Sequence, residues 1–221
     1  MVISASNQNF DKETTSKTGL ETLDVLNGID LQSEEIAWIT GSDVNFCAQA
    51  FPTVGYDHPD APILTVLGAV LRNGFLHSAI REKGGAYGSG AQQDSASRSF
   101  RFFSYRDPNC METFNAFNES IEWSLKSINS EKLEEGILGV ISSIDKPGSP
   151  AGEARADFNQ NIRGIDQSKR KIFRSRVINC SVERLVEVSN KYLTGEPKRS
   201  VISGKHFEKE IKDLGLSIHN V

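Results

Sequence analysis

The chain contains little cysteine and little histidine for its length of 221 residues. The cysteines form no C-x-x-C pair, which argues against a disulfide framework and against a zinc-ribbon site; they are Cys47, Cys110 and Cys180. We expect them to be buried, reduced thiols in a reducing compartment. The histidines lie too far apart for any two to share a helical turn, and they are His58, His77, His206 and His219. Because a catalytic zinc takes three protein ligands, we expect no metal site in this chain.

Several other features are missing, and each absence narrows the range of functions. No apolar run approaches the roughly 20 residues of a membrane span, and residues 1–19 lack the apolar segment of a secretory signal. There is no G-x-S-x-G nucleophile motif. The glycine-rich stretch Gly84–Gly90 follows a predicted helix and lacks the lysine and threonine of a phosphate-binding loop. We therefore expect no membrane partner, no serine hydrolase site and no nucleotide site.

Basic residues are slightly fewer than acidic ones: 25 Lys and Arg against 29 Asp and Glu, which gives a net charge of -4. An acidic chain is not typical of a nucleic-acid-binding protein. One basic run nevertheless lies between positions 163 and 176, and it consists of Arg163, Lys169, Arg170, Lys171, Arg174 and Arg176. We interpret it as the solvated face of a helix whose Ile172, Phe173 and Val177 point inward. A nucleic-acid-binding role for this run stays open as an alternative.

The length suits a single domain with an added segment. Residues 1–35 begin with a polar stretch rich in Ser, Thr, Asn and Lys and continue with scattered leucines. We expect them to form a flexible N-terminal segment and a strap that packs on a neighbouring domain. Residues 36–221 carry the periodic patterns of a folded domain. The chain is expected to be one piece of a longer polypeptide.

Residues 36–221 show strand and helix patterns in a definite order. Strands are predicted at 36–40, 44–51, 86–93, 98–106, 200–203 and 216–219. The first helix is predicted to begin at Asp60, as its cap, and to end at residue 83. Further helices are predicted at 107–128, 130–144, 151–163, 166–178, 181–193 and 205–212. This order predicts an α+β domain, in which helices pack on one face of an antiparallel β-sheet.

The most reactive stretch is Leu76–Gly90, which reads LHSAIREKGGAYGSG. Arg81 lies in the last turn of the predicted first helix. Gly84 and Gly85 are placed to end that helix, because glycine adopts the left-handed conformation without a Cβ penalty. Tyr87 follows on an extended segment, and a guanidinium and a phenol can together donate hydrogen bonds to a carbonyl oxygen or an oxyanion. The alternative is a helix-end arginine that compensates the helix dipole, followed by an ordinary strand tyrosine.

The same stretch resembles a motif of a known peptidase family. IREKGGAYG, preceded by LHSA, is similar to a sequence in the last domain of the presequence proteases. These form one branch of the pitrilysin and insulin-degrading family of zinc metallopeptidases, family M16. VNFCAQAF, the segment Tyr56–Pro59 and the long helix after it also resemble that family, so the resemblance covers about residues 36–221. It implies the repeat domain of this family, an antiparallel sheet with helices on one face.

The resemblance also implies roles for individual residues. In that family an Arg and a Tyr at this spacing hold the substrate carbonyl at a zinc site supplied by a different domain. The implied catalytic residues are therefore Arg81 and Tyr87, and the implied substrate-binding residues are Gly84, Gly85 and His77. The zinc ligands of the family come from an H-x-x-E-H motif, which is absent here. These 221 residues alone are therefore expected not to hydrolyse peptides.

The implied protein is a zinc endopeptidase that degrades short unstructured peptides, such as cleaved targeting presequences. Its implied partners are the peptide substrate and the remaining domains of the same polypeptide. The implied cofactor is a zinc ion in the N-terminal domain of the complete enzyme. Its implied location is a mitochondrion, a plastid or the bacterial cytoplasm. A catalytically inactive peptide-binding or scaffold module of the same fold stays open as an alternative.

Overall fold

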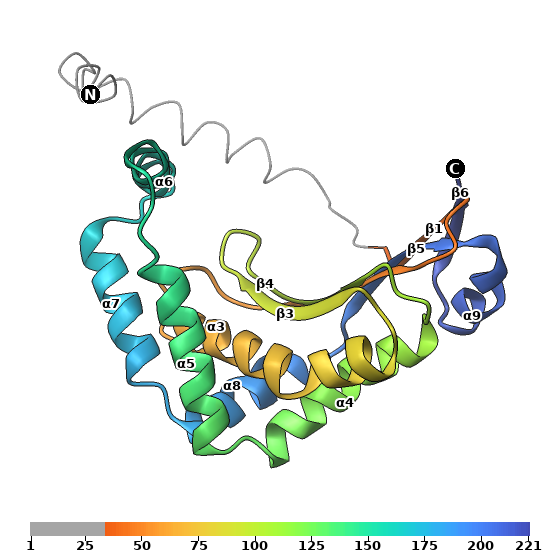
Figure 1. Ribbon diagram of the computed structural model, residues 1–221, viewed down its shortest axis with the longest axis horizontal. Helices are drawn as coiled ribbons and strands as arrows, with labels where there is room; N and C mark the ends of the chain where they lie inside the picture. Colours follow the sequence, from red (N-terminus) through yellow and green to blue (C-terminus); the bar gives the residue numbers. More distant parts are fainter. Residues whose placement is uncertain (1–33) are drawn as a thin grey trace.

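The computed structural model describes residues 34–221, so the expectation for residues 1–35 lies almost entirely outside the described residues. Six strands form one sheet in the order β3-β4-β2-β5-β1-β6 (Figure 1). Their bounds are β1 (Ile36–Thr40), β2 (Phe46–Pro52), β3 (Gly88–Asp94), β4 (Ser99–Tyr105), β5 (Lys198–Gly204) and β6 (Ser217–Asn220).

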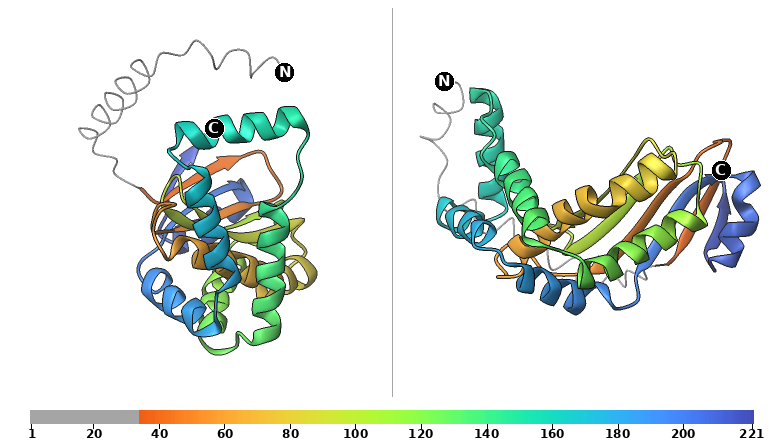
Figure 2. Two further views of the ribbon diagram at one scale, coloured as in Figure 1. Left: turned by 90° about the vertical axis from the view of Figure 1, so that its left-hand side faces the viewer. Right: turned by 60° about the horizontal axis from the view of Figure 1, so that its bottom comes forward.

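The helices gather on one face of this sheet. Their bounds are α3 (Ala61–Leu71), η1 (Arg72–Lys83), α4 (Met111–Lys126), α5 (Ser130–Ile144), α6 (Pro150–Ile162), α7 (Gln167–Ile178), α8 (Val182–Leu193), η2 (Lys205–Phe207) and α9 (Glu208–Asp213). The helices α3, η1, α4 and α8 contact the strands, and α5 and α7 pack on α3 (Figure 2). The helix α6 has no buried residue and stands away from the sheet (Figure 1). The predicted α+β class, with helices on one face, is confirmed.

The sheet is mixed, whereas the sequence predicted an antiparallel one. The strand pairs β3–β4, β4–β2 and β2–β5 are antiparallel. The strand β1 instead runs parallel to both of its neighbours, β5 and β6. Parallel neighbours need a long crossover connection, and the chain supplies one between β1 and β5 and another, through η2 and α9, between β5 and β6. Sequence periodicity does not report strand direction, so this difference depends on the tertiary fold.

One long helix runs through the centre of the domain. The continuous stretch Ala61–Lys83, formed by α3 and η1, has 23 residues and is by length and composition apolar enough to cross a membrane. This corrects the expectation that no such stretch exists in the chain. Half of its most apolar 18-residue window is buried inside the domain, and the helix contacts β3 and the surrounding helices. Its apolar character is therefore that of a core helix.

Asp60 lies at the N-cap position of α3, as predicted, but its side chain does not cap the helix. The carboxylate turns toward α8 and accepts hydrogen bonds from Arg184 (2.7 Å), Lys191 (2.9 Å) and Tyr192 (2.8 Å). Charged donors form stronger hydrogen bonds than a backbone N–H, which explains this choice. Asp60 therefore joins the start of the core helix to α8.

The strand β2 turns its more polar side toward the helices. Asn45, Cys47 and Gln49 are buried, while Phe46 on the alternate side is 39% exposed. The Asn45 side chain accepts from Ser203 and donates to the carbonyl of Asp107. Gln49 Nε2 donates to Asn118 Oδ1 at 3.0 Å, while Gln49 Oε1 is buried without a hydrogen-bond partner among the described residues. These hydrogen bonds offset much of the cost of burying Asn45 and Gln49. Phe51 is buried on the same side of β2, whereas Phe46 lies on the opposite face of the sheet.

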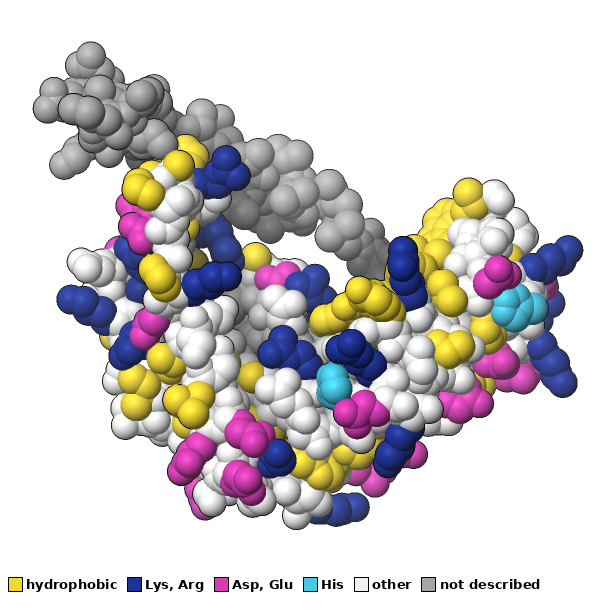
Figure 3. Space-filling view, viewed as in Figure 1, with side chains coloured by type: hydrophobic (Ala, Val, Ile, Leu, Met, Phe, Trp, Pro, Cys, Tyr) yellow, Lys and Arg dark blue, Asp and Glu magenta, His cyan; other side chains and the backbone are white. Residues whose placement is uncertain are grey.

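That opposite face carries an apolar surface, which we call the open face. Trp38 pairs with Ile202 across β1 and β5, and Ile202 pairs with Phe46 across β5 and β2. These three side chains and Tyr105 on β4 are between 39% and 45% exposed. Trp38, Phe46 and Ile202 line a shallow groove of about 440 Å³, and hydrophobic side chains are visible along this upper side of the molecule (Figure 3).

The basic run consists of Arg163, directly after α6, and five residues of α7, and three of its six side chains form ion pairs. Lys169 pairs with Asp57, Arg170 with Asp157 and Arg174 with Asp145, with N–O distances of 2.6–2.9 Å. As predicted, Phe173 and Val177 are buried beneath it; the prediction for Ile172 is wrong, because this side chain is 48% exposed. A helix with only two buried positions has a narrow inward stripe, and Ile172 lies outside that stripe.

Candidate functional site

The helix that carries His77 and Arg81 changes type before it reaches them. The α-helix α3 ends at Leu71, and η1 continues from Arg72 as a π-helix of 12 residues. In a π-helix the hydrogen bonds run from residue i to i+5, and such segments often occur at functional sites. The contact between His77 Nδ1 and Glu82 Oε1, at 3.4 Å, has this spacing. His77 therefore faces Glu82, a partner that the sequence did not indicate.

Gly84 and Gly85 end η1, as predicted, but for different reasons. Gly85 has φ +80, the left-handed conformation that ends many helices. Gly84 has an ordinary φ of −78, but a Cβ there would lie 2.6 Å from the carbonyl oxygen of Ile80. The N–H groups of Gly85 and Ala86 donate to the carbonyls of Arg81 and Ile80, both at 3.1 Å. The Gly85 bond spans four residues, as in a simple αL cap, whereas the Ala86 bond spans six, one more than the corresponding bond of the Schellman motif.

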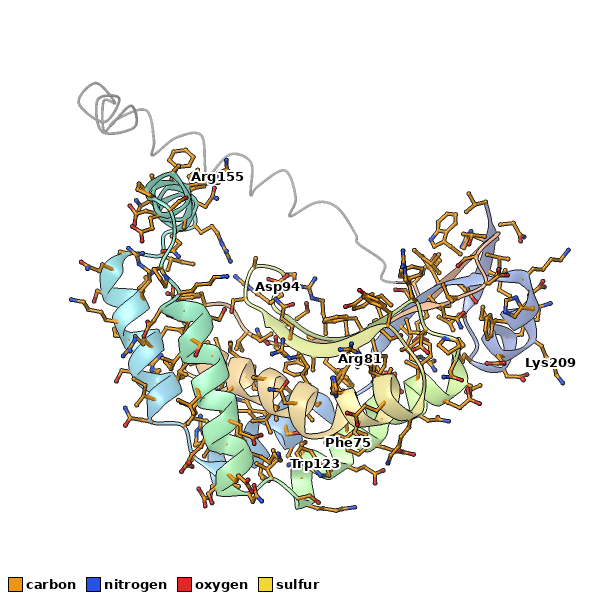
Figure 4. The ribbon with its side chains drawn as sticks, viewed as in Figure 1. Phe75, Arg81, Asp94, Trp123, Arg155 and Lys209 are labelled. Carbon is orange, nitrogen blue, oxygen red and sulfur yellow. The ribbon has the colours of Figure 1, made fainter. Side chains whose placement is uncertain are left out.

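Arg81 and Tyr87 lie on either side of this glycine turn, and both are accessible. Arg81 is exposed and lies on the side of η1 next to the sheet, while Phe75 lies on the side toward Trp123 of α4 (Figure 4). Tyr87 is 64% exposed and immediately precedes β3. A guanidinium and a phenol can therefore both reach a ligand outside the domain. Their accessibility is necessary for the role that the resemblance implies.

Three further residues touch the turn, and the sequence did not indicate a role for them at this site. The Tyr87 ring lies 5.6 Å from the Tyr105 ring, centroid to centroid, and the Arg106 guanidinium lies 5.8 Å from the Tyr87 centroid. The Tyr87 N–H donates to the Arg106 carbonyl at 3.2 Å. Asn109 Nδ2 donates to the Gly84 carbonyl at 2.6 Å. The only sequence signal nearby was the pair Asp107-Pro108, which predicted a helix start.

The segment 106–109, which we call the brace, is itself firmly held. Asp107 is fully buried, and its Oδ2 accepts from Thr113 Oγ1 at 2.7 Å, while its Oδ1 accepts from the Asn109 N–H at 3.0 Å. The backbones of Asp107 and Asn45 exchange two hydrogen bonds of 2.7 and 3.0 Å. The buried carboxylate thus ties the brace to α4, and the backbone of Asp107 ties it to Asn45, the residue just before β2. The turn between Arg81 and Tyr87 therefore has a rigid neighbour.

The described residues do not fit a metal ion. In the range 34–221 no group of three or more His, Cys, Asp and Glu side chains is arranged to hold one. The three cysteines are free and buried, as predicted. A hydrogen bond with the neighbouring Cys110 thiol, together with burial, raises the pKa of Cys47. Burial raises the pKa of Cys180 to about 11. Thiols held in the neutral form are poor ligands and poor nucleophiles.

Comparison with known proteins gives consistent relatives. The family model of the PreP C-terminal domain matches residues 40–201. The mitochondrial presequence protease of Danio rerio is 35% identical over 152 residues, which are 68% of this chain and 14% of that protein. The same protein of Drosophila melanogaster is 38% identical over 151 residues, 67% of this chain and 14% of the relative. The presequence protease of Yarrowia lipolytica is 36% identical over 159 residues, which are 72% of this chain and 16% of that protein. The chain thus spans only 14% to 16% of the length of these relatives.

Solved structures share the fold at low sequence identity. A protease from Helicobacter pylori has a TM-score of 0.66 and 16% identity, over 77% of this chain and 45% of that one. Pitrilysin has a TM-score of 0.59 and 15% identity, over 77% of this chain and 19% of the pitrilysin chain. A peptidase M16 inactive domain from Pseudomonas fluorescens has a TM-score of 0.59 and 17% identity, over 77% of this chain and 43% of that one. These identities show the fold alone, whereas the family model shows the family: the chain belongs to the presequence protease branch of the M16 peptidases and corresponds to its C-terminal domain.

Proposed function

We propose that this chain is the zinc-free C-terminal domain of a peptidase that degrades short unstructured peptides, and that Arg81 and Tyr87 bind the scissile carbonyl. The curated relatives are mitochondrial presequence proteases, which supports a mitochondrial location and peptide substrates. Since the described residues do not fit a metal ion, zinc chemistry would come from another part of the polypeptide. Within this domain the task is to hold the substrate.

The two side chains suit an oxygen that gains negative charge. The guanidinium of Arg81 donates with a permanent positive charge, and the phenol of Tyr87 donates through one O–H. Such donors act most strongly when they are positioned before the reaction. Removing one of them typically lowers the rate about a hundredfold, which corresponds to about 3 kcal/mol.

One observation carries the proposal: two exposed hydrogen-bond donors flank a turn whose backbone is tied from both sides. On one side the turn bonds the end of η1, at the carbonyls of Arg81 and Ile80. On the other side it bonds the brace, through Asn109 and Gly84. Side chains that bind a substrate group must be held in a fixed position, and a turn with a fixed backbone provides this. Exposed side chains without a ligand have no such requirement.

The test uses the complete polypeptide and a fluorogenic peptide. Arg81→Ala and Tyr87→Phe should each lower kcat about a hundredfold, with unchanged zinc content by metal analysis. The matched controls are Arg72→Ala, an exposed arginine at the other end of η1, and Tyr56→Phe, a tyrosine stacked on Phe173. Both controls should keep normal turnover. Normal turnover in both site variants would remove the assigned roles.

A second candidate is a catalytically inactive binding or scaffold domain. It is favoured by the fold neighbours, which include an inactive M16 domain. In that case the Arg81→Ala and Tyr87→Phe variants would weaken capture of a peptide without changing any rate. Peptide affinity, measured beside turnover in the same variants, separates the two functions.

A further inference from the structure

We infer that Arg106 is a positioning residue for Tyr87: it holds the phenol in the orientation from which the O–H can be donated to substrate. The inference rests on the proposed function and adds to it a residue to which neither the sequence motif nor the family resemblance assigns a role. It concerns the orientation of one ring and not contact with the reacting atoms.

The contact itself has the geometry of a cation–π interaction. The guanidinium carbon of Arg106 lies 5.8 Å from the centroid of the Tyr87 ring, within the range of about 6 Å in which such interactions are favourable. Tyr105 meets the same ring at 5.6 Å with an interplanar angle of 57°. A ring that is 64% exposed has few other contacts to fix its rotamer. These two neighbours therefore set where the phenol oxygen points.

The backbone of Arg106 supports this assignment. Its φ of +49 places it in the left-handed region, which is unfavourable for a long side chain and natural for glycine. Its carbonyl accepts the Tyr87 N–H at 3.2 Å, so the strained residue contacts Tyr87 through both backbone and side chain. A glycine would satisfy the backbone with less strain. The side-chain contact gives a physical reason for an arginine here.

The brace fixes Arg106 relative to the turn. The next residue, Asp107, is fully buried and bonded to Thr113 and Asn109. Asn109 reaches the Gly84 carbonyl at 2.6 Å, and Pro108 lies within 3.6 Å of where a Cβ on Gly85 would be. Both ends of the Arg106–Tyr87 contact therefore belong to one rigid unit, and a small displacement of the phenol would be transmitted directly to the site.

The first test is a double-mutant cycle in the complete polypeptide. Arg106→Gln removes the charge but keeps much of the side-chain length, and it should lower kcat roughly tenfold with little change in KM. Arg106→Lys should keep more of the rate, since it keeps the cation. Combined with Tyr87→Phe, which keeps the ring but lacks the hydroxyl, Arg106→Gln should cause no further loss of kcat.

The outcomes separate this inference from the function on which it rests. An equal loss in both backgrounds would mean that Arg106 acts independently of Tyr87. Normal kcat for Arg106→Gln, together with an impaired Tyr87→Phe, would overturn the inference and leave the proposed function intact. Normal turnover of the Tyr87→Phe single variant would overturn the role of Tyr87 and the positioning role with it, and normal turnover of Arg81→Ala as well would overturn the proposed function.

The second test separates positioning from a structural role. Arg106→Gly relieves the left-handed backbone, so the melting temperature of the 221-residue chain should rise by roughly 2 °C. The same change should lower kcat of the complete enzyme as much as Arg106→Gln does. Stability and activity would then move in opposite directions, which is typical of strain kept for function. A fall in both quantities would show that Arg106 is merely structural.

Discussion

The two glycines at the end of η1 serve different needs. Gly85 is required by its backbone, because φ +80 is unfavourable for residues with a Cβ. Gly84 is required by space, because its missing Cβ would meet the Ile80 carbonyl oxygen at 2.6 Å. That oxygen accepts the Ala86 N–H, so a displacement there would loosen the turn that separates Arg81 from Tyr87.

A pair of glycine substitutions tests this distinction at the level of single residues. Gly84→Ala should lower the free energy of unfolding by about 2 kcal/mol through overpacking. Gly139 lies on the exposed side of α5 with no atom within 4 Å of an added Cβ, so Gly139→Ala should raise it by about 1 kcal/mol. Urea unfolding of the 221-residue chain measures both. Similar shifts in the two variants would contradict the proposed crowding at Gly84.

At the scale of elements, Asp60 is the main polar link between the start of α3 and α8. Its side chain is nearly buried, whereas its partners Arg184 and Lys191 are partly exposed. Burial acts to raise the pKa of Asp60, but the hydrogen bonds from Lys191 and Tyr192 outweigh burial and hold the pKa below its ordinary value. The carboxylate is therefore charged in the folded protein at neutral pH.

This link predicts a pH-dependent loss of stability. Asp60→Asn should lower the free energy of unfolding by about 2 kcal/mol at pH 7, because a nearly buried acceptor of charged donors is lost. A depressed folded-state pKa stabilises the protein above the unfolded-state pKa of about 3.9, and this contribution disappears as the pH falls through the folded-state value. Denaturant unfolding from pH 7 to pH 2.5 should show the difference between variant and parent shrinking below roughly pH 4.

The matched control for this prediction is Asp145→Asn. Asp145 also pairs with an arginine, Arg174, but both side chains are more than 40% exposed. Solvent screens such a pair, so its removal should change stability much less than Asp60→Asn does. If the two variants lost the same stability, or if the effect of Asp60→Asn were independent of pH, the assigned link between α3 and α8 would be wrong.

At the scale of the whole molecule, the chain is a small part of its relatives, 14% to 16% of their length. The accessible Arg81 and Tyr87 and the open face with Trp38 and Phe46 are features that a larger polypeptide can use. The sequence contains no H-x-x-E-H motif, and residues 34–221 contain no metal-binding cluster. If Arg81 and Tyr87 bind the scissile carbonyl as proposed, hydrolysis still needs an activated nucleophile from another part of the polypeptide.

The isolated 221-residue chain should therefore not hydrolyse peptides. A fluorogenic peptide assay with added zinc, run beside the complete polypeptide as positive control, measures this directly. The expected result is turnover by the complete polypeptide only. Zinc-dependent turnover by the isolated chain, abolished by a chelator, would show that the catalytic assignment is wrong.

Much of this structure could be predicted from local sequence patterns. The order of strands and helices, the helix end at Gly84 and Gly85 and the family motif around Arg81 and Tyr87 depend on residues close together in the chain. Hydrophobic periodicity and glycine conformation are short-range effects, so they can be inferred from the sequence alone. The burial of all three thiols was also expected, because free cysteine is among the most buried residue types.

Other features were decided only by tertiary packing. Periodicity showed that β2 has two faces, but the partners that let Asn45 and Gln49 be buried come from distant residues. The sequence predicted Asp60 as a helix cap, but in the folded chain its carboxylate accepts hydrogen bonds from the charged Arg184 and Lys191 of α8. The contact between Arg106 and Tyr87 joins residues 19 positions apart, through a backbone conformation that arginine rarely adopts. The sequence by itself determined the local elements and the family, whereas pairing, burial and side-chain partners depended on long-range contacts that only the folded chain brings together.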